Sequence, residues 1–341
     1  MLRALPVDEW IAGTTPIIDV RSPGEFQRGR IPGACNLPLF TDEERAVVGT
    51  LYKQEGRDRA VIEGLRAVGP KLAWFVEEAQ RVAPDGRVRM HCWRGGERSG
   101  SMGWLLDKAG FADVCTLKLG YKGFRNRVQL DLKGTYDLRV LGGYTGTGKT
   151  GTLRHLRELG QQVIDLEALA SHKGSAFGSL GEKPQPTTEQ FENLLWEALR
   201  GIDPARPLWI EDESLMIGRV HIPPAFHAAM REAILYFVDL PQTARIEQLV
   251  ELYGAYPKEL LAEAIKRIAK RLGPQHCKSA LEALELDELD RVAAITLRYY
   301  DKAYLHGVSS RDPEQVIHLP IAPSALGSLA EYLIHRDAER Q

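Results

Sequence analysis

The first part of the chain alternates short apolar runs with polar turns. Residues 16–20, "PIIDV", and 87–92, "RVRMHC", predict two buried strands. Residues 99–111 place apolar side chains at helical spacing, and 113–121 predicts the next strand. Strands that alternate with helices indicate an α/β layer with a mostly parallel sheet. The intervening residues 41–70 predict a largely helical insertion.

The alternation starts again after a polar segment at 132–137. A strand, a glycine loop and a helix are predicted over 137–159. Further strands are predicted at 162–167, 207–214 and 233–241, and an amphipathic helix is predicted at 188–202. Residues 171–188 hold too many Gly, Ser and Pro for a regular element, so they predict a loop or lid.

The pattern divides the chain into three parts. We predict one α/β domain over 1–131 and a second over 132–242. From Thr243 onward the apolar spacing is helical, so 243–341 is predicted as a helical segment packed on the second domain. Cationic residues cluster within this segment at 266–271.

Composition narrows the class of protein. The 341 residues are 44% hydrophobic and 26% charged, as in soluble globular proteins. Neither a signal-peptide pattern nor an apolar run of membrane-spanning length occurs, so we expect a cytoplasmic protein without a membrane partner. The four cysteines form no CxxC pair, which favours reduced thiols over a disulfide frame or a zinc site. For Cys35, Cys115 and Cys277 a structural role is expected.

The net charge of −2 argues against a general polyanion binder. The charge is uneven, however, because residues 81–133 carry eleven Lys and Arg against five Asp and Glu. This surplus, and the cations at 266–271, are candidates for contacts with the phosphates of a nucleic acid. A solvated basic face is the alternative interpretation.

The segment 143–150 matches the pattern GxxxxGK[ST] between a predicted strand and a predicted helix. Such a loop turns its N–H groups toward phosphate oxygens, and the helix N-terminus adds its positive dipole. We expect Lys149 to reach the terminal phosphates, and the hydroxyl of Thr150 could hold Mg²⁺. The predicted diphosphate-binding residues are Gly143, Gly146, Gly148, Lys149 and Thr150.

Four acidic residues follow predicted strands of the second domain, where such folds place carboxylates that organise a metal or act as a base. They are Asp165, Glu211, Asp212 and Glu213. Solvated turn acids are an equal alternative for each, and no metal site is assigned with certainty.

The segment 91–99 places Cys92 at the head of a loop that opens a helix. Loop N–H groups and the helix dipole stabilise a thiolate and an anion beside it. We expect Arg94 and Arg98 to add charges suited to a tetrahedral oxyanion. The remaining anion-loop residues are predicted to be Trp93, Gly95, Gly96 and Ser99. The spacing fits both a cysteine phosphatase and a sulfur carrier.

Upstream and downstream residues favour the sulfur carrier. The segment 19–39, "DVRSPGEFQRGRIPGACNLPL", resembles the N-terminal motif of rhodaneses, and 119–125, "LGYKGFR", resembles their closing glycine-rich segment. Phosphatases of the cell cycle share this fold. The five residues between Cys92 and Arg98 make a loop one residue longer than in typical sulfurtransferases, which suits an anion of phosphate size.

The two loops in this order resemble the tRNA 2-selenouridine synthase family. The motifs are "HCWRGGERS", "GGYTGTGKT", "DLEALASHKGSAFG" and "EDESLMIG". The resemblance implies a rhodanese-like domain, a P-loop NTPase-like domain and a transferase acting on the wobble uridine of tRNA, with no protein partner. It implies geranylation of 2-thiouridine by geranyl diphosphate, then replacement by selenium from selenophosphate. It also implies that Cys92 carries selenium as an S-selanyl group.

Three other functions stay open at this point. An ATP-dependent rhodanese-type sulfurtransferase acting on tRNA would hydrolyse nucleotide and form a persulfide on Cys92. A rhodanese-fold phosphatase would turn over a generic aryl phosphate and would need a general acid. A nucleotide-gated tRNA binder without enzymatic activity would leave the position of Cys92 unexplained.

Overall fold

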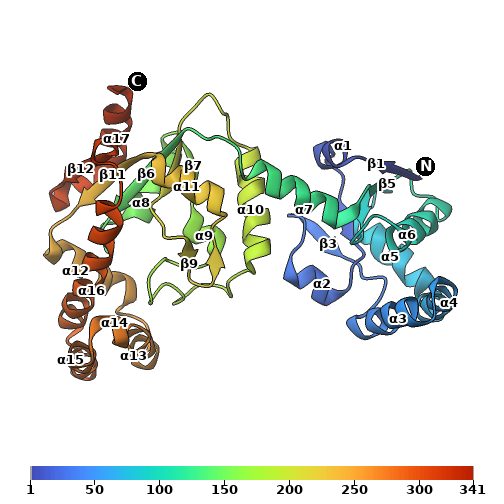
Figure 1. Cartoon of the computed structure of the whole chain (residues 1–341), viewed down its shortest axis with the longest axis horizontal. Coiled ribbons are helices and arrows are strands. Elements are labelled where there is room, and N and C mark those ends of the chain that lie inside the picture. The colour runs from blue at the N-terminus through green and yellow to red at the C-terminus, as the bar shows by residue number, and fades with distance from the viewer. Residues whose placement is uncertain (1, 341) are drawn as a thin grey trace. The chain divides into compact units, whose positions relative to one another are not determined.

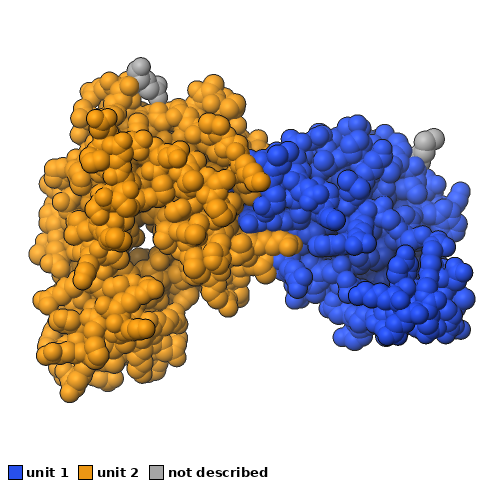
Figure 2. Space-filling view, viewed as in Figure 1, with its two compact units in different colours: residues 1–131, 192–196 blue, residues 132–191, 197–341 orange. Residues whose placement is uncertain are grey.

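The computed structural model describes residues 2–340 and falls into two compact units (Figures 1 and 2). Unit 1 runs to residue 131 and also takes in 192–196, while unit 2 comprises 132–191 and 197 onward. Each unit is built on a five-stranded sheet in which every paired strand is parallel. The α/β fold class is therefore confirmed.

The sheet of unit 1 has the order β1-β5-β4-β2-β3. Its strands are β1 (Leu2–Leu5), β2 (Ile17–Asp19), β3 (Ala34–Asn36), β4 (Arg87–His91) and β5 (Asp113–Leu117). Its helices are α1 (Val7–Ala12), α2 (Pro23–Arg28), α3 (Asp42–Gln54), α4 (Arg57–Val68), α5 (Leu72–Val82), α6 (Glu97–Lys108) and α7 (Gly120–Asp131), with a 3₁₀ turn η1 (Gly69–Lys71). The predicted helical insertion is the pair α3 and α4.

The central strands of unit 1 carry the cysteine loop. Four of the five residues of β4 are buried, as expected for a parallel strand covered on both faces. Ile18 on β2, Met90 on β4 and Leu106 on α6 belong to one apolar core. This core holds the carboxyl ends of β2 and β4, where Asp19 and His91 lie, in a rigid frame.

The strand predicted over 113–121 is wrong after Leu117. Leu119 and Gly120 have φ angles of 62° and 56°, so the chain turns through the left-handed region and α7 begins at Gly120. The apolar pattern of this segment continues into the helix, whose residues Tyr121, Phe124 and Val128 are fully buried.

The sheet of unit 2 has the order β12-β11-β6-β8-β7. Its strands are β6 (Leu138–Gly143), β7 (Gln162–Ile164), β8 (Leu208–Glu211), β11 (Ile234–Asp239) and β12 (Val316–Pro320); β9 (Met216–Ile217) and β10 (Val220–His221) form a separate hairpin. The first helices of this part of the chain are α8 (Lys149–Glu158), α9 (Leu166–Ala170), α10 (Thr188–Arg200) and α11 (Pro224–Glu232). Residues 171–187 contain no helix or strand, in agreement with the predicted loop.

The predicted C-terminal segment is helical except for β12. Its helices are α12 (Gln242–Tyr253), α13 (Lys258–Arg267), α14 (Ala269–Leu272), α15 (Pro274–Glu285), α16 (Leu289–Ser309) and α17 (Leu329–Ala338), with 3₁₀ turns η2 (Pro313–Gln315) and η3 (Pro323–Ser328). β12 pairs with β11 and extends the sheet, so this helical segment also contributes one strand that was not predicted. The cationic segment 266–271 is divided between α13 and α14, because the first helix ends at Arg267.

Candidate active-site loops

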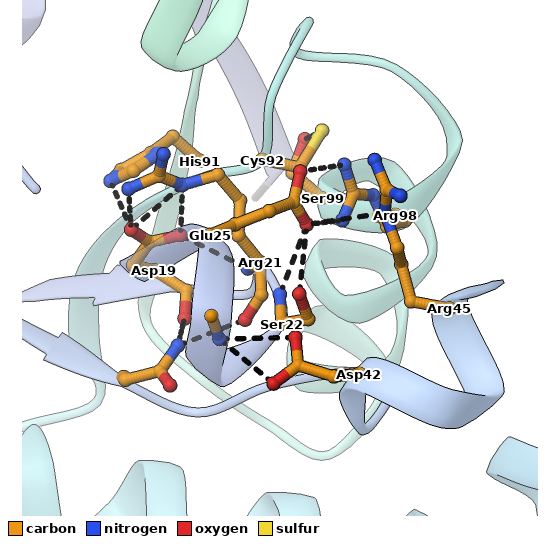
Figure 3. Close-up of polar contacts among 12 residues, drawn as sticks. Asp19, Arg21, Ser22, Glu25, Asp42, Arg45, His91, Cys92, Arg98 and Ser99 are labelled. Carbon is orange, nitrogen blue, oxygen red and sulfur yellow. Dashed lines mark hydrogen bonds and ion pairs between the residues drawn. The ribbon is translucent and has the colours of Figure 1, made fainter. Parts of the chain in front are cut away.

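Cys92 follows β4 directly, and α6 begins five residues later. The side chain is 3% exposed, and the hydroxyl of Ser99, in the first turn of α6, lies 3.2 Å from the sulfur as a hydrogen-bond donor (Figure 3). A hydroxyl donor and the N-terminal end of a helix both favour a negative sulfur. The sulfur is therefore buried at a helix N-terminus, with a hydroxyl donor beside it.

The closing segment of unit 1 packs against this loop through two glycines. The N–H groups of Tyr121 and Lys122 donate to the carbonyls of Cys92 and Trp93 at 2.8 and 3.0 Å. A Cβ on Gly120 would lie 2.3 Å from the Cys92 carbonyl oxygen, and one on Gly95 would lie 2.3 Å from that of Leu117. No larger side chain fits between the two backbones, so both positions require glycine.

Arg98 does not point freely into the loop. Its Nη1 donates to Glu25 of α2 at 2.6 Å, and Arg45 of α3 lies 3.8 Å from the same carboxylate (Figure 3). Burial acts to raise the pKa of Glu25, but the hydrogen bonds and charge of Arg98 outweigh it and the pKa is lowered. Glu25 is thus ionised and holds Arg98 beside Cys92, whereas Arg94 is exposed.

A buried polar layer lies beneath the cysteine. Arg21 and Asp19 form a fully buried ion pair at 2.6 Å, and the Arg21 guanidinium stacks 3.7 Å from the ring centre of Tyr121. His91 is also fully buried. Burial lowers the pKa of His91 to about 4 despite the nearby Asp19 carboxylate, so the imidazole is neutral at pH 7.

The lowered pKa of His91 makes the stability of unit 1 depend on pH. An unfolded His gains its proton near pH 6.5, whereas folded His91 gains it only near 4, so acid favours unfolding between these values. From pH 7 to 5 we expect the wild type to lose about 2 kcal/mol more unfolding free energy than His91→Phe. Urea unfolding at both pH values measures this. His276→Gln, at an exposed histidine, is the control and should lose as much unfolding free energy as the wild type. If the wild type and His91→Phe lose equal amounts between pH 7 and 5, the lowered pKa of His91 is contradicted.

The glycine loop of unit 2 joins β6 to α8. All six residues of β6 are buried, and Gly143, Gly146 and Gly148 have φ angles of 147°, 83° and 74°. The Nζ of Lys149 donates to the carbonyls of Gly143 and Tyr144 at 3.0 and 3.4 Å, which keeps the ammonium over the loop. Together with the N-terminal end of α8, this arrangement suits a diphosphate.

Comparison with known proteins assigns a known domain to each of the two units. Residues 6–127 match the model of the rhodanese-like domain, and 136–259 match that of the tRNA 2-selenouridine synthase AAA domain. A tRNA 2-selenouridine synthase of Sulfurovum sp. (strain NBC37-1) is 35% identical, over 94% of this chain and 96% of its own. The chain belongs to the tRNA 2-selenouridine synthase family.

Two further relatives in this family align over similar lengths. The tRNA 2-selenouridine synthases of Shewanella loihica and Bdellovibrio bacteriovorus are each 34% identical, over 91% and 87% of this chain and 92% and 89% of their own. The expected rhodanese-like and P-loop-like domains are thereby confirmed. Within residues 2–340, every helix is too short or too polar to cross a bilayer.

Two of the predicted carboxylates bond to other groups of the protein. Asp165 caps α9 by accepting from the N–H of Ala168 at 2.7 Å. Asp212 pairs with Arg311 at 2.7 Å. Both carboxylates are therefore engaged within the protein.

Glu211, Glu213 and Glu167 lie together near the phosphate loop. Glu211 accepts from the Glu167 N–H at 2.6 Å, and its Oε2 is a buried atom with no hydrogen-bond partner. Burial first, and neighbouring carboxylates second, raise the pKa of Glu211 and of Glu213 well above the ordinary value. Carboxyl groups whose pKa is raised in this way are suited to exchange a proton.

Glu167 was not among the predicted residues, although the quoted motif "DLEALASHKGSAFG" contains it. Thr150 lies 3.4 Å from Glu167 Oε2 as a hydrogen-bond donor. Across residues 2–340, no three His, Cys, Asp or Glu side chains converge closely enough to hold a metal ion by themselves. Thr150 and Glu167 are the side chains at this loop that could contact a Mg²⁺ ion bound with a diphosphate.

A large cavity of about 1520 Å³ lies in unit 2, whose surface is visibly hollowed in Figure 2. Glu213 and Tyr304 line it, and Tyr304 also lies over Lys149, whose Nζ is 5.2 Å from the ring centre. Its charged lining residues are six cations, Lys183, Arg219, Arg231, Arg267, Lys270 and Arg271, and three acids, Glu182, Asp212 and Glu213. Three of the cations come from the cationic segment 266–271. A cationic cavity beside a phosphate loop is suited to a nucleic-acid strand.

The other aromatic and glycine residues of the two loops pack within the protein. Trp93 is half-buried with its ring 5.8 Å from that of Tyr121, and Gly96 is the N-cap of α6. The ring of Tyr144 packs on Phe237. Among the other cysteines, Cys115 and Cys277 are buried and Cys35 is exposed.

Proposed function

We propose that this chain is a tRNA-modifying transferase that converts 2-thiouridine at the wobble position into 2-selenouridine. The observation that carries the proposal is the presence of two anion loops of different chemistry in one family member: a thiol loop at Cys92 and a phosphate loop at Lys149. A thiol loop suits chalcogen transfer, and a phosphate loop suits departure of a diphosphate.

The first step is assigned to the phosphate loop. The sulfur of 2-thiouridine attacks C1 of geranyl diphosphate, the C–O bond breaks, diphosphate leaves and the uridine loses its N3 proton. Lys149 and the loop N–H groups would neutralise the leaving diphosphate. Glu213 and Glu167 lie close enough to the loop to serve as proton acceptors for a substrate bound there, once ionised.

The second step is assigned to the cysteine loop. Selenium of selenophosphate adds to C2 of the geranylated uridine, geranylthiol leaves, and water takes up the phosphoryl group as phosphate. The helix α6 and the Arg98 guanidinium, held by Glu25, provide positive charge for the oxyanion. The Cys92 thiol is proposed to contact the selenium of bound selenophosphate during this step, without forming a covalent bond to it.

Mass spectrometry of wobble nucleosides tests the proposed function. Thiolated tRNA is incubated first with geranyl diphosphate and then with selenophosphate, and nucleosides are analysed after each addition. We expect a geranyl adduct after the first and 2-selenouridine after the second. Incubation with ATP in place of geranyl diphosphate is the control for a nucleotide-driven sulfurtransferase. No mass change in either step would refute the proposal.

A further inference from the structure

Arg45, on helix α3 of the helical insertion, lies beside the cysteine loop of unit 1. Its Nε is 3.8 Å from Oε2 of Glu25, the same oxygen to which Nη1 of Arg98 donates at 2.6 Å. Figure 3 shows both arginine side chains next to this carboxylate. The sequence pattern did not single out Arg45, because its segment was predicted only as part of a helical insertion.

Glu25 has enough partners without Arg45. Its Oε2 also accepts from the N–H and the hydroxyl of Ser22 at 3.2 and 3.3 Å, and its Oε1 accepts from Nη2 of Arg98 at 3.3 Å. The bidentate pair with Arg98 already balances the one negative charge of Glu25. The positive charge of Arg45 is therefore a surplus beside the cysteine loop.

The position of α3 does not depend on Arg45. In the first turn, both carboxylate oxygens of Asp42 accept from the N–H of Gly24 on α2 at 3.0 Å, and Glu44 accepts from Lys71 at 2.6 Å. The contact of Arg45, at 3.8 Å, is too long for a hydrogen bond, and its side chain is 52% exposed. An ion pair of this kind contributes little to stability, so a structural role does not account for Arg45.

The two arginines differ in the donors that they can offer to an anion. Arg98 directs both of its Nη groups to Glu25. Arg45 faces the same carboxylate with its Nε, so its two Nη groups lie farther from it. A guanidinium with free Nη groups fits two oxygens of a tetrahedral oxyanion at once. Arg45 is thus better placed than Arg98 to donate two hydrogen bonds to such an anion.

We propose that Arg45 is an oxyanion-binding residue of the cysteine loop, whose guanidinium contacts the phosphoryl oxygens of selenophosphate. The inference rests on the proposed function, which assigns the selenophosphate step to this loop. Two guanidinium groups and one carboxylate leave one positive charge beside the N-terminal end of α6, which complements an anion. No bond forms or breaks at Arg45, so the contact contributes to binding alone.

Kinetics of selenation at varied selenophosphate concentration test the inference on tRNA that already carries the geranyl group. We expect Arg45→Ala to raise KM for selenophosphate about 10-fold with kcat unchanged, the effect of losing a charged hydrogen-bonding partner that acts in binding. Arg45→Lys keeps the charge but not the fork, and should recover part of the loss. The control is Arg59→Ala, since Arg59 is 54% exposed, belongs to the same insertion and pairs with Glu55. It should behave as wild type.

Thiophosphate, a tetrahedral oxyanion with sulfur in place of selenium, separates the inference from the proposed function. Titration calorimetry without tRNA should show about 10-fold weaker thiophosphate binding in Arg45→Ala and no change in Arg59→Ala. Such a result in a protein that does not selenate tRNA would support the site and refute the proposed function. Selenation with an unchanged KM in Arg45→Ala would overturn the inference and leave the proposed function intact. Equal effects of the two alanine variants, or a lower kcat at unchanged KM, would also overturn it.

Discussion

Lys149→Ala is expected to lower geranyl transfer to thiolated tRNA by about 100-fold, the usual effect of removing one charge-stabilising donor. The ammonium lies over the loop, 3.0 Å from the Gly143 carbonyl, where it would meet charge developing on the departing diphosphate. Selenation of tRNA that already carries the geranyl group should continue, because that step is assigned to the other loop. Single-turnover assays of each step, followed by mass spectrometry, measure both.

A cation on the same helix provides the control for Lys149→Ala. Arg154 of α8 is 75% exposed and pairs only loosely with Glu158, at 3.9 Å, so Arg154→Ala removes one charge without altering the loop. It should retain geranyl transfer. Equal losses in the two variants would mean that the total positive charge matters rather than the position of Lys149, and would argue against the assignment of the diphosphate to this loop.

Cys92→Ser is expected to abolish selenation, with a loss of about 100-fold or more, while geranylation proceeds. Serine keeps the size of the side chain in a site that is 3% exposed, so the fold should survive. Its hydroxyl, however, is less polarizable and less nucleophilic than a thiol, so it does not replace the sulfur as a contact for selenium. Geranylated tRNA should therefore accumulate when both co-substrates are present.

The exposed Cys35 provides the matched control for Cys92→Ser. Cys35→Ser makes the same substitution on β3 of the same unit, away from the loop, and should leave both steps intact. Loss of geranylation together with selenation in Cys92→Ser would show that the two steps do not divide between the loops as proposed.

The two loops could be predicted because each depends on contiguous residues. A buried strand, a glycine-containing turn and a helix N-terminus follow one another within a dozen residues at Cys92 and again at Lys149. Backbone geometry alone then directs N–H groups and the helix dipole into the turn. Strands β2, β4, β6, β8 and β11 were predicted for the same reason, since each is a short segment with local apolar residues next to a turn.

The errors occur where distant segments decide. Arg98 was predicted to add a charge suited to an oxyanion, but the sequence did not show that Glu25, seventy-three residues earlier, pairs with it. β12 lies in a stretch surrounded by helices, and it is a strand because the edge of β11 accepts it. Asp165 and Asp212 follow strands as expected, yet a helix cap and Arg311 engage them, while Glu167 reaches Thr150.

By itself, the sequence determined the α/β class, the two anion loops and the chemistry that each loop can support, because these follow from local residue patterns. Only the tertiary structure decided what surrounds each loop. Tyr304 of α16 lies over Lys149, more than a hundred positions earlier, and the large cavity gathers side chains from equally distant segments. Helical periodicity shows that α16 has an apolar face, but only packing determines that this face lies beside the phosphate loop.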